Sequence, residues 1–146
     1  MDIKKRHLPH WSADDSLYYI TFNYQNLVMN AEEQLITLNH IKEGNKKFYI
    51  LHAVIVMPDH VHLILEPCAG YSLSRIMKGI KGVSARKINL ARNSNGSIWQ
   101  DESFDRIIRD ENEYNEKMLY MFENPLRAGL TEEPQDYIGW YYNDNI

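Results

Sequence analysis

The feature that most limits the fold is a largely apolar, β-branched run between residues 48 and 66, broken only by Pro58-Asp59 near its middle. Proline fits the first central position of a tight turn and aspartate fits the second. The run therefore predicts two strands, 48–57 and 60–66, that pair through this turn.

The second of these strands carries two histidines, His60 and His62, separated by one valine. Alternate side chains of a strand project from the same face, so the two imidazoles lie side by side. The other face is purely aliphatic and is expected to belong to the core. A polar pair on a buried sheet needs a metal ion, a hydrogen-bond network or solvent as its partner. We interpret the pair as a metal-binding element, although imidazole alone does not fix the metal.

The elements before this strand pair are a strand and a helix. Residues 17–25 are rich in aromatic and β-branched side chains, which is typical of a strand. Asn30, with a glutamate three residues later, predicts the start of a helix that runs to about Lys42 and ends at Gly44-Asn45.

The elements after the strand pair are a helix, a strand and a helix. Ser72 or Ser74 is expected to cap a helix to about Asn89, within which two glycines would allow close backbone approach to a ligand. Residues 98–108 predict a fourth strand. Asp110 is expected to cap a third helix, 111–124, which Pro125 would stop because the residue before proline avoids the helical region.

The order β-α-β-β-α-β-α predicts an α+β fold, a ferredoxin-like or RRM-like plait with an antiparallel sheet covered by helices. The length of 146 residues suits one domain, with an amino-terminal arm over residues 1–12 and a tail over 126–146. A single cysteine, Cys68, and the lack of a long apolar run predict a soluble cytoplasmic protein without membrane spans.

The charge is distributed unevenly along the chain. The net charge is −4, but residues 67–100 contain six bases and no acid, so this segment is +6 and the rest of the chain is −10. An acid-free basic segment predicts binding to a polyanion, whereas a merely solvated helix face would usually mix both signs.

A third metal ligand can be sought on the last helix. Tyr120 and Asn124 are four residues apart and share one helix face. The amide oxygen of Asn124 suits a hard cation such as Mg²⁺ or Mn²⁺. Tyr114 does not offer the same pairing, because Met118 stands four residues after it. The alternative is that Tyr120 packs in the core and Asn124 ends the helix.

Three segments together resemble a known family: Met-Pro-Asp-His-Val-His (57–62), Trp-Gln-Asp-Glu-Ser-Phe-Asp-Arg-Ile-Ile-Arg (99–109) and Tyr-Met-Phe-Glu-Asn-Pro-Leu-Arg-Ala-Gly-Leu (120–130). They are similar to the single-tyrosine transposases of the HUH (His-hydrophobic-His) endonuclease superfamily. The branch they resemble is the REP-associated tyrosine transposases, which are like those of insertion sequence 200. Residues 6–11 and 19–22 fit the same branch.

The resemblance implies a role for each site residue. His60 and His62 match the metal-binding pair, and Tyr120 matches the nucleophile that forms a 5′-phosphotyrosine link to DNA. Asn124 matches the third metal ligand, which is glutamine in the insertion-sequence relatives. The metal would be Mg²⁺ or Mn²⁺. The expected activity is cleavage and rejoining of DNA strands by a metal-dependent enzyme.

The implied partner is single-stranded DNA beside a hairpin, bound by a monomer or a homodimer. Lysines and arginines would contact its phosphates, and exposed rings would stack on unpaired bases. Trp99 and Phe104 are expected to be core residues rather than stacking platforms. The side chains expected to contact phosphate are Lys78, Lys81, Arg86 and Lys87, with Lys4, Lys5 and Arg6 as a basic arm.

Two alternatives remain open from the sequence. His60, His62 and Glu66 have the His-x-His-x3-Glu spacing of cupin metalloenzymes, but Val54 stands where that motif has glycine. Interleaved helices also contradict a jelly-roll barrel. The other alternative is a DNA-hairpin-binding module without catalysis.

Overall fold

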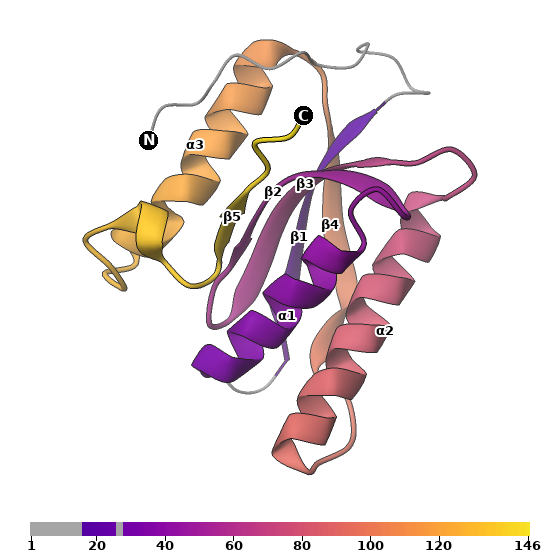
Figure 1. Cartoon of the computed structure of the whole chain (residues 1–146), viewed down its shortest axis with the longest axis vertical. Coiled ribbons are helices and arrows are strands. Elements are labelled where there is room, and N and C mark those ends of the chain that lie inside the picture. The colour runs from indigo at the N-terminus through magenta and orange to yellow at the C-terminus, as the bar shows by residue number, and fades with distance from the viewer. Residues whose placement is uncertain (1–15, 26–27) are drawn as a thin grey trace.

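The computed structural model describes residues 16–25 and 28–146, and Figure 1 shows its elements in chain order. They follow the order that the sequence predicts, and a short 3₁₀ turn and one additional strand follow near the carboxyl end. None of the helices in the described ranges is both long enough and apolar enough to cross a membrane. The elements are β1 (Leu17–Tyr24), α1 (Ala31–Glu43), β2 (Tyr49–Val56), β3 (His60–Pro67), α2 (Leu73–Arg92), β4 (Trp99–Ile108), α3 (Glu111–Arg127), a 3₁₀ turn η2 (Pro134–Asp136) and β5 (Trp140–Tyr142).

The strands form one antiparallel sheet in the order β4-β1-β3-β2-β5. The first four strands have the order of a ferredoxin-like plait, so the predicted α+β fold class is confirmed. β3, which carries the histidine pair, lies at the centre of the sheet. β5 extends the sheet beyond β2 and was not predicted, because three aromatic residues give too short a pattern.

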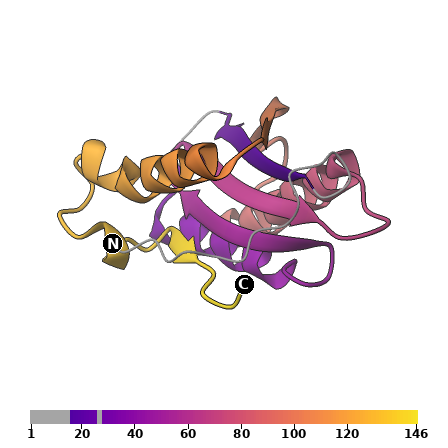
Figure 2. The same ribbon diagram turned by 90° about the horizontal axis from the view of Figure 1, so that it is seen from above.

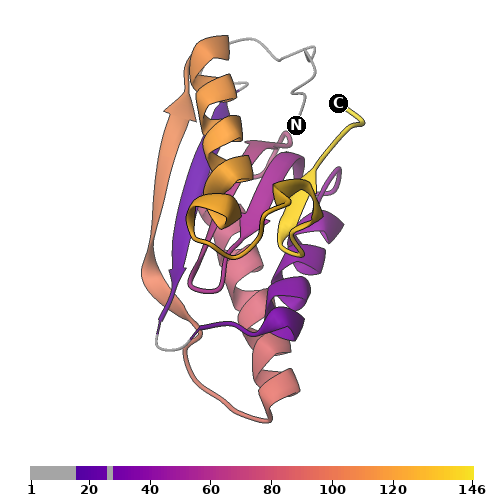
Figure 3. The ribbon, with the colours of Figure 1, turned by 90° about the vertical axis from the view of Figure 1, so that its left-hand side faces the viewer.

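The helices cover the two faces of the sheet unequally. Seen from above and from the side, α3 lies on one face, and α1 and α2 lie together on the other (Figures 2 and 3). Alternation along β3 separates two cores: Val61 packs toward α1 and α2, and Ile64 packs toward α3. His62 faces the α3 side, in register with Thr21 of β1 and Ile55 of β2.

Local signals set both ends of α1. Asn30 and Glu33 form the predicted capping box, in which each side chain accepts the backbone N–H of the other residue. At the other end, Gly44 stays in a right-handed conformation, but any Cβ there would overlap the side chain of Tyr49. Only glycine therefore fits at this position, because the side chain of Tyr49 occupies the space of a Cβ.

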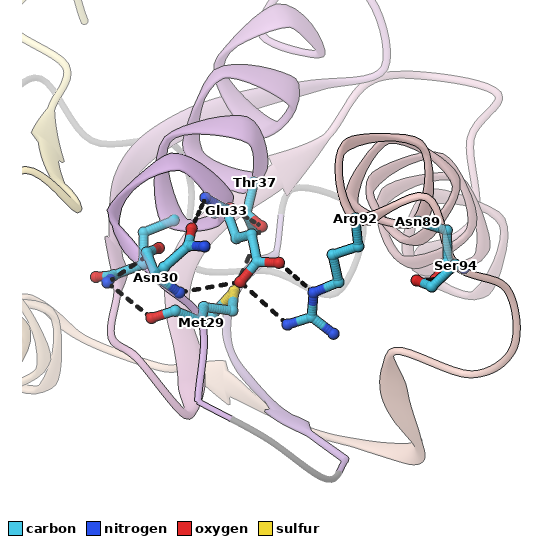
Figure 4. Close-up of polar contacts among 8 residues, drawn as sticks. Met29, Asn30, Glu33, Thr37, Asn89, Arg92 and Ser94 are labelled. Atoms are coloured by element: carbon cyan, nitrogen blue, oxygen red, sulfur yellow. Dashed lines mark hydrogen bonds and ion pairs between the residues drawn. The ribbon is translucent and has the colours of Figure 1, made fainter.

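Glu33 also joins α1 to the end of α2. Its carboxylate is almost fully buried and accepts two hydrogen bonds from the guanidinium of Arg92. Figure 4 shows this side chain reaching across from α2 to the first turn of α1. Arg92 is the last residue of α2, which ends three residues later than predicted and is capped by Asn93, whose φ is positive.

The prediction that Pro125 stops α3 is wrong. The helix continues to Arg127, and the following Gly129 takes a positive φ. Proline has no backbone N–H to donate to the carbonyl of Met121 and its ring crowds that carbonyl, yet the helix continues for two residues beyond it. The backbone N–H groups of Ala128 and Gly129 close the last turn.

The expectation for the two aromatic residues of β4 is half right. Trp99 is buried and donates a hydrogen bond from its ring nitrogen to Ser84. Phe104 is 56% exposed, so its assignment to the core is wrong. It stands opposite Thr21 on the face that α3 covers, but β4 is the edge strand and the helix does not reach over this side chain.

Candidate active site on the α3 face of the sheet

Two imidazole rings lie together at the start of β3. The ring centroids of His60 and His62 are 4.6 Å apart. His60 is partly exposed and follows the Pro58-Asp59 turn, whereas His62 is only 9% exposed. The structure thus brings the pair side by side, as the alternation of a strand requires.

Each ring is held through its Nδ1 atom. Asp59 Oδ1 accepts a hydrogen bond from His60 Nδ1 at 2.7 Å, and Thr21 Oγ1 lies 2.7 Å from His62 Nδ1. Such partners fix the orientation of a metal-binding imidazole and its tautomer. Because Nδ1 is engaged in both rings, Nε2 is the nitrogen left for a metal ion.

Tyr120 reaches this pair from α3. Its ring centroid lies 5.9 Å from that of His62, with the two planes at 70°. The side chain is 49% exposed, so a substrate could reach it, and the alternative that it is a core residue is wrong. Tyr114, in contrast, is buried and its hydroxyl is 2.9 Å from His52 Nδ1.

A second tyrosine and two cations complete the surroundings. Tyr19 of β1 stacks on His62, with centroids 5.5 Å apart and planes at 16°. Lys117 Nζ lies 5.0 Å from the centre of the Tyr19 ring, and Arg127 Cζ lies 4.2 Å from the centre of the Tyr120 ring. The site therefore combines two imidazoles, two phenols and two positive charges.

These neighbours shift two pKa values in the site. Burial, His60, Arg127 and Lys117 lower the pKa of His62 to about 3, although Asp59 opposes them. Its imidazole is therefore neutral at neutral pH, which is the state that binds metal. Burial and the nearby Tyr120 raise the pKa of Tyr19 to about 12, which disfavours ionisation of that phenol.

Asn124 is buried on α3, one turn after Tyr120. The alternative in which it ends the helix is wrong, because α3 continues to Arg127 and Ala128 occupies the cap. Within residues 16–25 and 28–146, no group of three histidine, cysteine, aspartate or glutamate side chains could hold a metal ion. A third ligand from this part of the chain would therefore be of another type, and an amide oxygen is chemically suitable.

The basic residues expected to contact DNA lie elsewhere. All four described ones are on α2, which covers the sheet face opposite the histidines. Lys78 and Arg86 are exposed, and Lys87 Nζ is 3.8 Å from Glu43. Lys81 is engaged by β4: its Nζ donates to the carbonyls of Gln100 and Asp101 at 2.7 and 3.0 Å, and to Ser103 Oγ at 3.1 Å. Lys4, Lys5 and Arg6 lie outside the described residues.

The glycines of α2 do not approach the histidine site either. Gly79 lines a cavity of about 410 Å³ between α1 and α2, together with Phe48, Tyr71 and Arg75. Gly82 does not line it, and a Cβ at either glycine would meet open space. The expected close approach of a ligand to these glycines stays a prediction.

Sequence reasoning missed four side chains of the site: Tyr19, Thr21, Lys117 and Arg127. The two on β1 could be found only from the β1–β3 register, which joins residues 41 positions apart. The two cations carry a local signal, since Lys117 precedes Tyr120 by three residues and Arg127 follows it by seven. For Arg127, the expected helix end at Pro125 removed that signal, whereas Lys117 lies within the predicted helix.

The family is established by comparison with known proteins. The profile of the family described as "Transposase IS200 like" matches residues 19–115, well over half of the chain. The chain belongs to this family, which confirms the resemblance seen in its sequence. The matched segment contains the histidine pair and ends before Tyr120.

Individual proteins agree with this assignment. The REP-associated tyrosine transposase of Escherichia coli (strain K12) is 23% identical over 124 residues, which cover 82% of this chain and 72% of the relative. A solved REP-associated tyrosine transposase bound to a REP hairpin superposes with a TM-score of 0.66 at 20% identity, over 94% of this chain and 80% of the other. A solved protein of Deinococcus radiodurans gives a TM-score of 0.52, also at 20% identity, over 84% and 97% of the two chains.

Proposed function

We propose that this transposase-family protein cleaves and rejoins hairpin-bearing single-stranded DNA, with Tyr120 as the nucleophile and a divalent metal ion as cofactor. The observation that carries the proposal is the convergence of Tyr120 from α3 with the histidine pair of β3. A binding module would have no need to combine a metal-ligand pair with an accessible phenol.

The donor set fits a divalent ion. His60 and His62 would bind it through Nε2, since Nδ1 of each ring is held by Asp59 or Thr21. Asn124 is the residue of this chain proposed as the third ligand. When bound, Mg²⁺ or Mn²⁺ would polarise the scissile phosphate and neutralise charge on its oxygens.

Tyr120 would carry out the covalent step. Its phenolic oxygen attacks the phosphorus, the bond from phosphorus to the 3′ oxygen breaks, and the DNA 5′ end becomes linked to the enzyme. The phenol loses its proton and the departing 3′ oxygen gains one. The freed 3′ hydroxyl can later attack the phosphotyrosine, which rejoins strands without an external source of energy.

Tyr19 is the competing nucleophile, because it also contacts His62. Two observations favour Tyr120. Tyr19 is more enclosed and its pKa is raised to about 12, whereas Tyr120 is half exposed on the helix face. In addition, Tyr19 stacks flat against the histidine ring, which leaves less room for in-line attack on a phosphate.

The test is formation of a covalent protein–DNA adduct that survives denaturation. Wild-type protein with Mn²⁺ and end-labelled single-stranded DNA containing a hairpin should give the adduct, and chelation of the metal should prevent it. Tyr120→Phe should abolish it, whereas Tyr19→Phe should keep it. An adduct that persists in Tyr120→Phe and disappears in Tyr19→Phe would assign the reaction to the other phenol. Tight hairpin binding with no adduct under either metal would instead support a binding module.

A further inference from the structure

We infer that Arg127 is a positioning residue for Tyr120, which holds the phenol ring beside the histidine pair and keeps a positive charge next to it. The inference rests on the proposed function, in which Tyr120 is the nucleophile. It adds a residue outside the histidine, tyrosine and asparagine set.

The helix geometry places Arg127 on the face of Tyr120. Seven residues correspond to almost two full turns of an α-helix, so the two side chains lie nearly one above the other. This requires the helix to continue through Pro125, which it does. A helix that ended at Asn124 would leave the direction of Arg127 unfixed.

The guanidinium contacts Tyr120 in two ways. Nη2 donates a hydrogen bond to the backbone carbonyl of Tyr120 at 2.6 Å, and Cζ lies 4.2 Å from the centre of its ring. Nη1 is 3.7 Å from Glu123 Oε1, which is a further contact that restrains the arginine. The planar fork of arginine suits such combined donation and stacking, whereas the ammonium of lysine does not.

Tyr120 needs such a restraint because packing alone does not hold it. Half of the side chain is exposed, and on the sheet side its ring meets the edge of His62. Arg127 contacts the ring as well, so the phenol has both the guanidinium and the imidazole as neighbours. Holding reactive groups near their attack geometry is a large contribution to catalysis, and a displacement of about 1 Å can cost about 100-fold in rate.

The charge of Arg127 also acts on the site. Its guanidinium lies against the ring of Tyr120, and that ring in turn contacts His62. Negative charge develops on the phenolic oxygen and on the phosphoryl group during attack, and a fixed cation nearby stabilises it. Arg127 would therefore favour the reaction both by position and by charge.

The experiment compares Arg127→Gln, Arg127→Lys and Arg109→Gln, which removes an exposed arginine just before the same helix. Two quantities are measured with hairpin DNA and Mn²⁺: the rate of adduct formation in a single turnover at saturating DNA, and the Kd for the hairpin. Arg127→Gln should slow the reaction about 10- to 100-fold, with Kd changed less than about twofold. Arg127→Lys should be intermediate, and Arg109→Gln should behave as wild type.

A readout without metal or DNA separates this inference from the proposed function. In protein labelled at the tyrosine ring carbons, the Tyr120 resonances are assigned by their loss in Tyr120→Phe. Arg127→Gln should move them toward the positions of a freely rotating exposed tyrosine, and Arg127→Lys should move them part of the way. If Arg127→Gln does not fold, Arg127→Lys decides by the same two measurements.

Unchanged Tyr120 resonances, or a wild-type rate in the Arg127 variants, would overturn the inference. If wild-type protein forms no adduct, the proposed function fails, and the resonances still show whether Arg127 holds the ring.

Discussion

Thr21 Oγ1 and His62 Nδ1 lie 2.7 Å apart across the β1–β3 pair. This contact joins the most buried imidazole of the site to the neighbouring strand. It leaves Nε2 as the nitrogen available to a metal ion, and it depends on register rather than on any local sequence pattern. Loss of this hydroxyl should therefore weaken metal binding more than it weakens the fold.

Thr21→Val tests this relationship. Valine keeps the shape of threonine but removes the hydroxyl, so Nδ1 of His62 loses its partner. We expect the affinity for Mn²⁺ to fall about 10- to 100-fold, as is typical for partners of metal-bound histidines. The free energy of unfolding without metal should fall by about 1 kcal/mol. Titration calorimetry with Mn²⁺ and urea unfolding measure the two effects.

Thr21→Ser is the matched control, because it restores the hydroxyl in a smaller side chain. Its Mn²⁺ affinity should be near that of the wild type. Equal affinities for Thr21→Val and wild type would show that this hydroxyl does not orient the histidine.

The lowered pKa of His62 predicts how stability depends on pH. The pKa of His62 is about 3 in the folded protein, whereas the ordinary pKa of histidine in an unfolded chain is 6.5. Between these values the unfolded chain binds more protons, so stability is present above about pH 6.5 and is lost as the pH falls. One group can contribute at most about 1.4 kcal/mol per pH unit.

Urea unfolding of metal-free protein between about pH 6.5 and 5 measures the slope of the free energy of unfolding against pH. Most carboxylates titrate below this pH range. His62→Gln should flatten it. His40, whose pKa is lowered by burial, is the comparison: His40→Gln should flatten the slope as well. A slope unchanged in His62→Gln would show that this imidazole is not held neutral by the fold.

Much of the fold could be predicted because its signals are local. The Pro-Asp turn, the period of two in β3 and the capping residues Asn30, Ser72 and Asp110 each act within a few residues, and the structure has all of them. The order of elements then leaves few topologies, of which the plait is the common one. β5 could not be predicted, because this three-residue strand forms by pairing with β2, which lies far from it in the sequence.

In the candidate site, too, the residues with local signals could be predicted and those that depend on strand pairing could not. The spacing of His60 and His62 fixes their common face, and the resemblance supplied Tyr120. The hydroxyl of Thr21 and the ring of Tyr19 reach the site only through strand register, which a single sequence does not reveal. Arg127 is not found from the sequence, because proline disfavours a helical conformation in the residue before it and so predicts an end at Asn124, whereas α3 continues to Arg127.

The basic residues of α2 predict separable effects on DNA binding. Lys78 and Arg86 are exposed, so replacing both with glutamine should weaken hairpin binding and reduce the slope of log K against log salt by about 1.4 to 1.8. Lys81 is bound to β4, so Lys81→Gln should reduce stability more than DNA affinity. Fluorescence anisotropy over a range of salt concentrations and thermal unfolding distinguish the two. An unchanged salt slope in the double variant would exclude this helix face as a phosphate-binding surface.

The Glu33–Arg92 pair predicts a large effect on stability far from the site. Arg92→Met leaves the buried carboxylate of Glu33 without its charged partner, and breaking such a pair from one side costs about 3 kcal/mol or more. Glu33→Gln should cost less, because the amide oxygen can still accept the backbone N–H of Asn30. Combining the two changes should cost less than the sum, since the unpaired charge is gone. Urea unfolding of the three variants gives these free energies.

Lys87→Met is the control for this measurement. Its ion pair with Glu43 is longer, at 3.8 Å, and exposed on the same two helices, so its loss should change stability by less than about 1 kcal/mol. Because Arg92 lies on the sheet face opposite Tyr120, folded Arg92→Met protein should still form the covalent adduct at the wild-type rate. Similar unfolding free energies for Arg92→Met and Lys87→Met would mean that the α1–α2 joint is held by its apolar contacts alone.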